Sequence, residues 1–313
     1  MNEITLIGLD LAKNIFRVNA LDKHGKRVMN KNICRGSMVS FFANLPSCVV
    51  AMEACSSCHY WARTIESLGH EVRIIHPRYV TPYRLGDKND ANDAAAISAA
   101  ALRPDMRFVR MKSQSQSDIQ AIHRVREGLV KEKTTTINRI RGLLAENGIT
   151  IRQGPTWVFT LVPAIISDEC NDLSGIMRGL LRVQHEHLMH LRAQIKELEL
   201  TLKTLAAQDE ASQRLMQIPG VGLLTATLLS SEVGNGVAFR NSRAFAAYLG
   251  LVPRQYSSGG KDRLRGIGKT GNRQLRTLLI HCARSVQRSV NQGKTPFGGG
   301  PLEEWVRGLI GRR

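Results

Sequence analysis

The chain has 313 residues, of which 42% are hydrophobic, so it is long enough for two cores and is not a disordered protein. Its 44 Lys and Arg residues against 26 Asp and Glu give a net charge of +18, which favours DNA or RNA as partners. No apolar run approaches the ~20 residues of a membrane-spanning helix, and no export signal is visible. We therefore expect a cytoplasmic chain with free cysteines and no membrane partner.

The first third of the sequence alternates between strand-like and helix-like segments. Strands are predicted at 5–10, 15–21, 28–33, 48–52 and 72–75, and helices at 38–44, 60–68 and 90–102. This order predicts an α/β domain with a mixed sheet over residues 1–112, in which the first and fourth strands can be neighbours.

The rest of the chain is predicted to be mostly helical. Two long polar helices, 115–146 and 173–205, flank a turn at 153–155 and form a helical or coiled-coil connector over 113–210. Their heptads are irregular, so pairing within one chain and pairing between chains both remain open. A mostly α C-terminal domain is expected over 211–296, followed by a flexible tail over 297–313.

Four acids lie at the ends of predicted strands and helices of the first domain. Asp10 ends the first strand, Glu53 ends the fourth, and Asp90 and Asp93 lie three apart at the start of a helix, on one face. Four carboxylates this close would repel one another unless cations neutralised them, and hard oxygen ligands suit Mg²⁺ or Mn²⁺. The pattern therefore predicts a metal-dependent phosphodiester site. The alternative for Asp90 alone is an ordinary helix N-cap.

The segments Gly8-Leu9-Asp10-Leu11-Ala12-Lys13, Met52-Glu53-Ala54 and Asn89-Asp90-Ala91-Asn92-Asp93 resemble the catalytic segments of the DEDD insertion-sequence transposases. That family includes the pilin-gene inverting recombinases and the bridge-RNA-guided recombinases. The resemblance implies a RuvC-like domain of the ribonuclease H fold. It also implies that Asp10, Glu53, Asp90 and Asp93 are its catalytic metal ligands.

The C-terminal segment is strongly basic. Eleven Lys and Arg residues lie between Arg240 and Arg288, against the single acid Asp262, which indicates an anionic partner. Within this segment, Tyr256-Ser257-Ser258-Gly259-Gly260-Lys261 places two serines on what reads as an exposed, mobile Gly-rich loop. Such a stretch is more often an ordinary loop, although nearby arginines can clamp a phosphate while a hydroxyl attacks it.

Leu249-Gly250-Leu251-Val252-Pro253-Arg254, the serines, and Ile267-Gly268-Lys269-Thr270-Gly271-Asn272 are similar to the C-terminal transposase domain of the same family. Because the family's nucleophilic serine directly precedes a glycine, the resemblance selects Ser258 as the nucleophile. Ile218-Pro219-Gly220-Val221-Gly222 resembles a helix-hairpin-helix turn, which holds DNA phosphates through backbone N–H groups; an ordinary tight turn is about equally compatible. The expected nucleic-acid contacts are Arg254, Lys261, Arg263, Arg265, Lys269, Arg273, Arg276, Gly220 and Gly222.

The favoured hypothesis is an insertion-sequence transposase that cuts and rejoins donor and target DNA through Ser258. The resemblance also implies a non-coding guide RNA as partner. Because the acids and the serine are far apart in the sequence, we expect a dimer that assembles to a tetramer on DNA. Two alternatives are a junction resolvase that uses water as nucleophile, and a non-catalytic nucleic-acid-binding protein whose acids cap helices.

Overall fold

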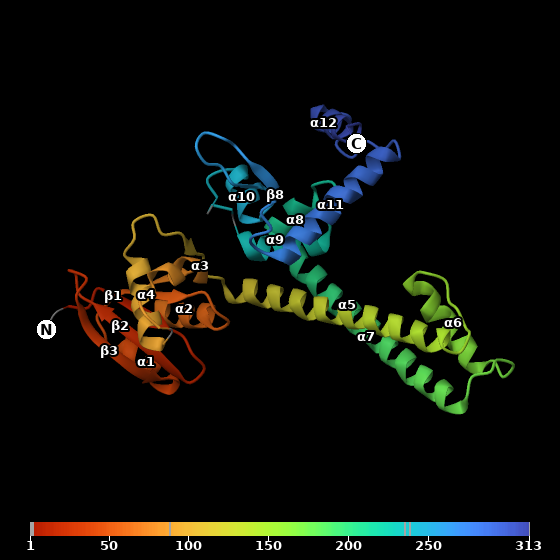
Figure 1. Cartoon of the computed structure of the whole chain (residues 1–313), viewed down its shortest axis with the longest axis horizontal. Coiled ribbons are helices and arrows are strands. Elements are labelled where there is room, and N and C mark those ends of the chain that lie inside the picture. The colour runs from red at the N-terminus through yellow and green to blue at the C-terminus, as the bar shows by residue number, and fades with distance from the viewer. Residues whose placement is uncertain (1–2, 88, 235, 238, 313) are drawn as a thin grey trace. The chain divides into compact units, whose positions relative to one another are not determined.

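The computed structural model describes residues 3–87, 89–234, 236–237 and 239–312, and the chain divides into the units Met1–Gln114 and Ser115–Arg313 (Figure 1). The first unit contains the strands β1 (Leu6–Asp10), β2 (Ile15–Leu21), β3 (Arg27–Cys34), β4 (Val49–Glu53), β5 (Glu71–Ile75) and β6 (Phe108–Val109). Its helices are α1 (Met38–Ala43), α2 (Cys58–Ser67), α3 (Pro77–Val80) and α4 (Asp90–Ala101).

The strands form one mixed sheet in the order β3-β2-β1-β4-β5-β6. β1, β2 and β3 are antiparallel neighbours, whereas β1, β4 and β5 run parallel. The expected pairing of the first and fourth strands is confirmed, with Leu9 beside Met52. The mixed α/β architecture is consistent with the expected RuvC-like, ribonuclease H-type domain.

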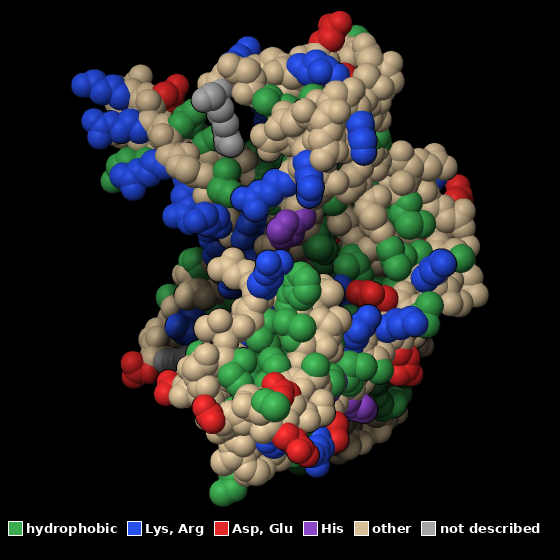
Figure 2. Space-filling view, turned by 90° about the vertical axis from the view of Figure 1, so that its right-hand side faces the viewer, with side chains coloured by type: hydrophobic (Ala, Val, Ile, Leu, Met, Phe, Trp, Pro, Cys, Tyr) green, Lys and Arg blue, Asp and Glu red, His purple; other side chains and the backbone are tan. Residues whose placement is uncertain are grey.

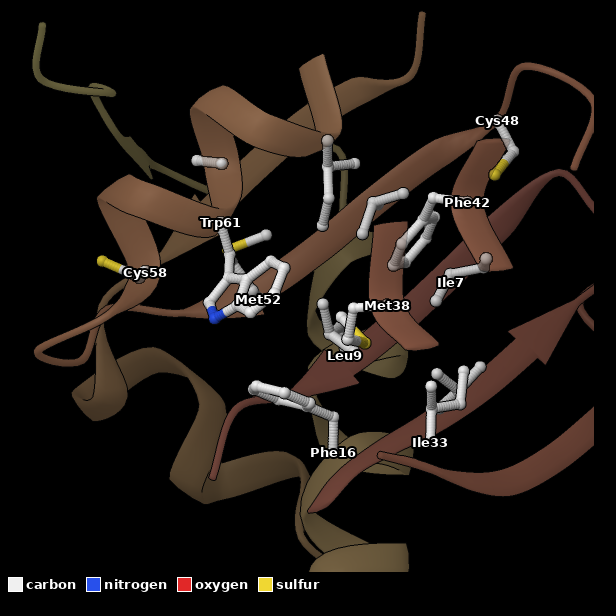
Figure 3. Packing of buried hydrophobic residues seen from close by; sticks show 14 of the residues in the cluster. Ile7, Leu9, Phe16, Ile33, Met38, Phe42, Cys48, Met52, Cys58 and Trp61 are labelled. Carbon is white, nitrogen blue, oxygen red and sulfur yellow. The ribbon is translucent and has the colours of Figure 1, made fainter. Parts of the chain in front are cut away.

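Side-chain alternation along the strands separates two cores, because successive residues of a strand point to opposite faces of the sheet. Ile7 and Leu9 of β1 pack with Met52 of β4 against α1 and α2, where Trp61 and Phe42 are buried (Figure 3). On the opposite face, Leu6, Ala51 and Ile75 pack with alanines of α4. The sheet is therefore covered by helices on both faces.

The second unit begins with a helical hairpin made of α5 (Gln114–Ala145), α6 (Pro155–Ser167) and α7 (Gly175–Gln208). Ile140 and Leu144 of α5 share a core with Val158 and Val162 of α6 and Leu181 of α7. The long helices α5 and α7 are also joined by an ion pair between Arg126 and Glu199 and by a 2.8 Å hydrogen bond from Arg139 to Gln184. The structure thus pairs these helices within one chain. It also adds α6, where the sequence predicted only a turn.

Shorter helices complete the second unit: α8 (Glu210–Met216), α9 (Leu223–Val233), α10 (Ser242–Tyr248), α11 (Arg273–Asn291) and α12 (Pro301–Ile310). Leu228, Leu249 and Leu275 form a small core between α9, α10 and α11. The strands β7 (Pro253–Gln255) and β8 (Leu264–Ile267) make a separate antiparallel hairpin. Residues 297–313, predicted as a flexible tail, contain α12, whose first turn is fixed by buried Glu303: its carboxylate accepts from the Phe297 and Gly299 amides.

Across the described residues, no helix is both long enough and apolar enough to cross a membrane.

Candidate active site

The same alternation that builds the cores places two of the four acids on one face of the sheet. Leu6, Gly8 and Asp10 are on the α4 face of β1, and Ala51 and Glu53 are on the same face of β4. Both strands run parallel and both acids are the last residues of their strands. Asp10 and Glu53 therefore lie at one edge of the sheet, on the side that α4 covers.

Gly8 allows α4 to approach this edge closely. A Cβ atom at Gly8 would lie 2.7 Å from the backbone nitrogen of Ser98 and would overlap the carbonyl oxygen of Ala94. The helix is held there by a buried 2.6 Å hydrogen bond from Asn19 of β2 to the Ser98 hydroxyl. A side chain at position 8 would push away the helix that carries the other two acids.

Asp90 and Asp93 lie in the first turn of α4. The N-cap is Asn89, whose side-chain oxygen accepts from the Asn92 amide at 2.9 Å, so the alternative that Asp90 caps the helix is wrong. Asn89 thus takes the capping role that Asp90 would otherwise fill. The position of the two aspartates at the positive end of the helix dipole stabilises their negative charges.

The other three carboxylates act electrostatically on Asp10. Burial raises the pKa of Asp10 to about 6, and the carboxylates of Asp93, Asp90 and Glu53 act in the same direction. The half-buried Arg84 offsets part of the charge, since its guanidinium lies 3.2 Å from the Asp93 carboxylate. Asp10 is therefore close enough to all three other acids for their charges to raise its pKa.

The chemistry of these four acids suits a divalent cation, but their side chains are not arranged around one ion site. All four supply the hard oxygen ligands that Mg²⁺ and Mn²⁺ prefer, and a bound cation would favour the ionised form of Asp10, whose pKa is raised by burial and, to a smaller extent, by repulsion from the other acids. In the described part of the chain, however, no three acidic, His or Cys side chains converge as the ligands of one ion. The ion pair between Arg84 and Asp93 holds one of the carboxylates on a different partner.

Ser258 belongs to the second unit, at the tip of the β7–β8 hairpin. Gly259 and Gly260 form its two-residue turn with positive φ angles of 56° and 75°, which favour glycine and are typical of a type I′ turn. The predicted mobile loop is instead a hairpin, in which Ser258 pairs with Lys261.

Cross-strand pairing separates the two serines. Residues opposite one another share a face, so Ser258, Lys261, Tyr256 and Arg263 lie on one side of the hairpin. The neighbouring pair, Ser257 and Asp262, lies on the other. The Ser257 hydroxyl accepts from the Arg263 amide at 3.3 Å, whereas within the described residues no hydrogen bond engages the Ser258 hydroxyl.

Cations accompany Ser258 on its face of the hairpin. Lys261, Arg263 and Arg265 are exposed there, and the guanidinium of Arg265 lies over the ring of Tyr256 at 4.8 Å. The acid of this segment, Asp262, is on the other face and accepts from Gln255 at 3.3 Å. Lys and Arg side chains also predominate in the upper part of Figure 2, where the C-terminal helices lie in Figure 1.

The remaining basic residues differ in accessibility. Lys269 and Arg273 are exposed, and Arg254 is exposed while donating to the carbonyl of Gly268 at 3.0 Å. Arg276 is a correction to the expected set. It is buried, and its guanidinium donates to the carbonyls of Leu249 and Thr270 at 3.0 and 2.6 Å, so it fixes the end of α10 and not an external phosphate.

Gly220 and Gly222 lie in the turn between α8 and α9. Gly220 has a φ of +83°, and a Cβ atom there would lie 2.8 Å from the carbonyl oxygen of Cys282, so the turn packs tightly against α11. Gly222 is the N-cap of α9 and adds no side-chain bond to the first amides of that helix. This arrangement suits both the helix-hairpin-helix interpretation and a purely structural turn.

Three residues of these sites escaped the sequence analysis. Arg84 has no local signal, because only the fold brings it to Asp93. Tyr256 was quoted only as a neighbour of the serines, although the Gly259-Gly260 pair is a hairpin signal that predicts its face. Gly8 was part of the quoted motif, but its closeness to α4 becomes visible only in the folded sheet.

The sequence matches known proteins over its whole length. Residues 7–148 match the DEDD transposase family of IS110, and residues 212–297 match the family described as the Transposase IS116/IS110/IS902 family. A protein of Pseudomonas aeruginosa named "Probable family 20 transposase" is 44% identical over 99% of this chain and 90% of its own length. The transposase for insertion sequence element IS1328 of Yersinia enterocolitica is 42% identical over 100% of this chain and 91% of its own. The transposase for IS1111A of Coxiella burnetii is 41% identical, over 100% and 85% respectively.

Proposed function

Because this chain belongs to the IS110 family of insertion-sequence transposases, we propose that it cuts and rejoins DNA by covalent attack of Ser258 on a backbone phosphate. The observation that carries this proposal is the face of the β7–β8 hairpin. It combines Ser258, whose hydroxyl has no hydrogen-bond partner among the residues that the structure describes, with Lys261, Arg263 and Arg265. Such cations stabilise the charge that develops on a phosphate under attack.

The proposed step is a phosphoryl transfer, in which one bond to phosphorus forms as another breaks. A bond forms between Ser258 Oγ and phosphorus while one phosphorus–oxygen bond of the DNA strand breaks. The serine proton leaves to a base, and the departing DNA oxygen takes up a proton. Attack by that hydroxyl, or by one from a second DNA strand, on the phosphoserine reverses the step and rejoins the DNA.

The acids of the first unit complete the proposed site. Asp10, Glu53, Asp90 and Asp93 would hold Mg²⁺ or Mn²⁺, which when bound supplies positive charge at the reacting phosphate. Asp10, with a pKa raised to about 6, would be favoured in its ionised form by such a cation.

The acids and Ser258 belong to different units of the chain, so a composite site requires the two units to meet at one phosphate. We propose that they meet between protomers of a dimer that assembles to a tetramer on donor and target DNA, because recombination requires at least two DNA duplexes held together. The net charge of +18 is compatible with a second polyanion, which we propose is the non-coding guide RNA that the resemblance of the sequence implies. The remaining exposed cations, Arg254, Lys269 and Arg273, are proposed phosphate contacts.

A covalent-adduct assay tests the nucleophile. The purified chain is incubated with Mg²⁺, RNA transcribed from the DNA beside the gene, and a plasmid that carries both flanks of the gene. The reaction is then stopped with SDS. Wild-type protein and Ser257→Ala are expected to form protein–DNA adducts, and Ser258→Ala is expected to form none. Adducts that persist in Ser258→Ala would remove the serine from the mechanism.

The same assay addresses the two alternatives. A junction resolvase would cut the plasmid without any adduct, whereas a non-catalytic binding protein would leave it uncut. The resolvase hypothesis is not favoured, since the relatives that match the whole chain are transposases.

A further inference from the structure

Tyr256 lies beside the proposed nucleophile in an unusual environment for a large ring. The residue is 64% exposed, and it lies two residues before Ser258 on the same face of the hairpin. Residues two apart in a strand are separated by about 6.7 Å, which is about two steps of ~3.4 Å between stacked bases. A phosphate at Ser258 would therefore bring a nearby base within reach of the ring.

The ring is also held in place from one side. The guanidinium of Arg265, from the opposite strand, lies 4.8 Å from the ring centroid, in the diagonal position of an antiparallel pair. Because the hairpin turn is fixed by Gly259 and Gly260, both side chains keep their common face. The high exposure of the ring shows that the protein itself leaves much of its surface uncovered.

We propose that Tyr256, supported by Arg265, is a stacking platform for an unpaired nucleobase next to the phosphate that Ser258 attacks. Exposed aromatic rings among cations bind bases in this way, because every base has a π-face and the backbone is held by positive charge. The substrate class is therefore DNA in which a base beside the scissile phosphate is unstacked from its duplex. The inference rests on the proposed function for the position of the phosphate, but its stacking step can be measured without any cleavage.

The test uses the full-length chain and a single-stranded oligonucleotide with one central 2-aminopurine, whose fluorescence is quenched by stacking. Affinity and quenching are measured for wild type, Tyr256→Leu and Tyr256→Phe. Leu264→Ala is the matched control, because Leu264 is 69% exposed on the opposite face of the same hairpin. Circular dichroism confirms that each variant is folded.

Tyr256→Leu is expected to weaken binding by about 5-fold to 100-fold, the effect of losing one base–aromatic stack, and to abolish the quenching. Tyr256→Phe keeps the ring and is expected to stay within about twofold of wild type, as is Leu264→Ala. Wild-type affinity and quenching in Tyr256→Leu would overturn the proposal. A Phe variant as weak as the Leu variant would also overturn it, since the hydroxyl and not the ring would then make the contact.

Two further readouts separate this inference from the proposed function. Ser258→Ala is expected to quench 2-aminopurine like wild type, so failure of the serine mechanism in the adduct assay leaves the stacking result intact. Tyr256→Phe is expected to form adducts. Loss of adducts in Tyr256→Phe together with their retention in Ser258→Ala would make the tyrosine the nucleophile and would overturn both proposals.

Discussion

Replacing Asp10 with asparagine is expected to stabilise the metal-free chain at neutral pH. In the wild type, Asp10 ionises in a half-buried position beside three other acids, and its pKa is raised from 3.8 to about 6. This difference corresponds to about 3 kcal/mol of destabilisation once the carboxyl is ionised. Because the site is partly open to water, screening reduces the expected gain of Asp10→Asn to about 1–2 kcal/mol.

The gain has a defined dependence on pH. The folded state binds the Asp10 proton more tightly than the unfolded state, so this group lowers stability as the pH rises from 3.8 to about 6. Asparagine has no proton to lose and removes this contribution. The difference between Asp10→Asn and wild type should be near zero at pH 4 and complete above pH 6.

Trp61 provides a local probe for the measurement, because it is buried in the core of the first unit, whereas Trp157 and Trp305 lie in the second. In a background with both of these changed to phenylalanine, urea unfolding followed by Trp61 fluorescence reports on the acid-bearing unit. The control is Asp105→Asn, an exposed acid of the same unit, which should change stability by less than about 0.5 kcal/mol. Equal stability of Asp10→Asn and wild type at pH 8 in EDTA would refute the destabilising effect of the buried Asp10 carboxylate beside the other acids.

Two further predictions concern a close packing contact and a buried histidine. Gly8→Ala is expected to destabilise the first unit by about 1–3 kcal/mol, because its Cβ would overlap the backbone of α4; an unchanged urea midpoint would show that α4 can retreat freely. His123 is buried against the Thr227 hydroxyl at 2.9 Å, and burial lowers its pKa to about 4. Because the unfolded chain binds the His123 proton more tightly, the free energy of unfolding should fall as the pH falls from 6.5 toward 4. In acid unfolding followed by circular dichroism, His123→Gln should make the free energy of unfolding depend less on pH over this range.

Periodic hydrophobic patterns made most of the elements predictable. The sequence pattern predicted a strand at 15–21, where β2 lies, and it predicted long helices within a few residues of α5 and α7. The type of sheet followed as well, because strands joined by a hairpin and strands joined by helices have different directions. The acids were placed at the ends of these elements by the sequence alone.

The elements that the sequence analysis missed depend on distant partners. Gly154-Pro155 reads as a turn, yet Pro155 begins α6, whose Val158 and Val162 become buried only against α5 and α7. The β7–β8 hairpin has short, exposed strands without an alternating apolar pattern, so the sequence analysis predicted a mobile loop there, and only the Gly259-Gly260 turn could have indicated the hairpin. Arg276 was indistinguishable from its basic neighbours until α10 and α11 enclosed it.

The sequence by itself determined which residues carry charge, which segments become strands or helices, and which acids end them, because these properties depend on neighbours within a few positions. Tertiary structure brought Asp90, Asp93 and Glu53 close enough to Asp10 to raise its pKa, and it brought Arg84 into an ion pair with Asp93. It also brought the guanidinium of Arg265 over the ring of Tyr256, beside Ser258. Electrostatic and stacking interactions act through space over a few ångströms, and only the folded chain brings these side chains within that range.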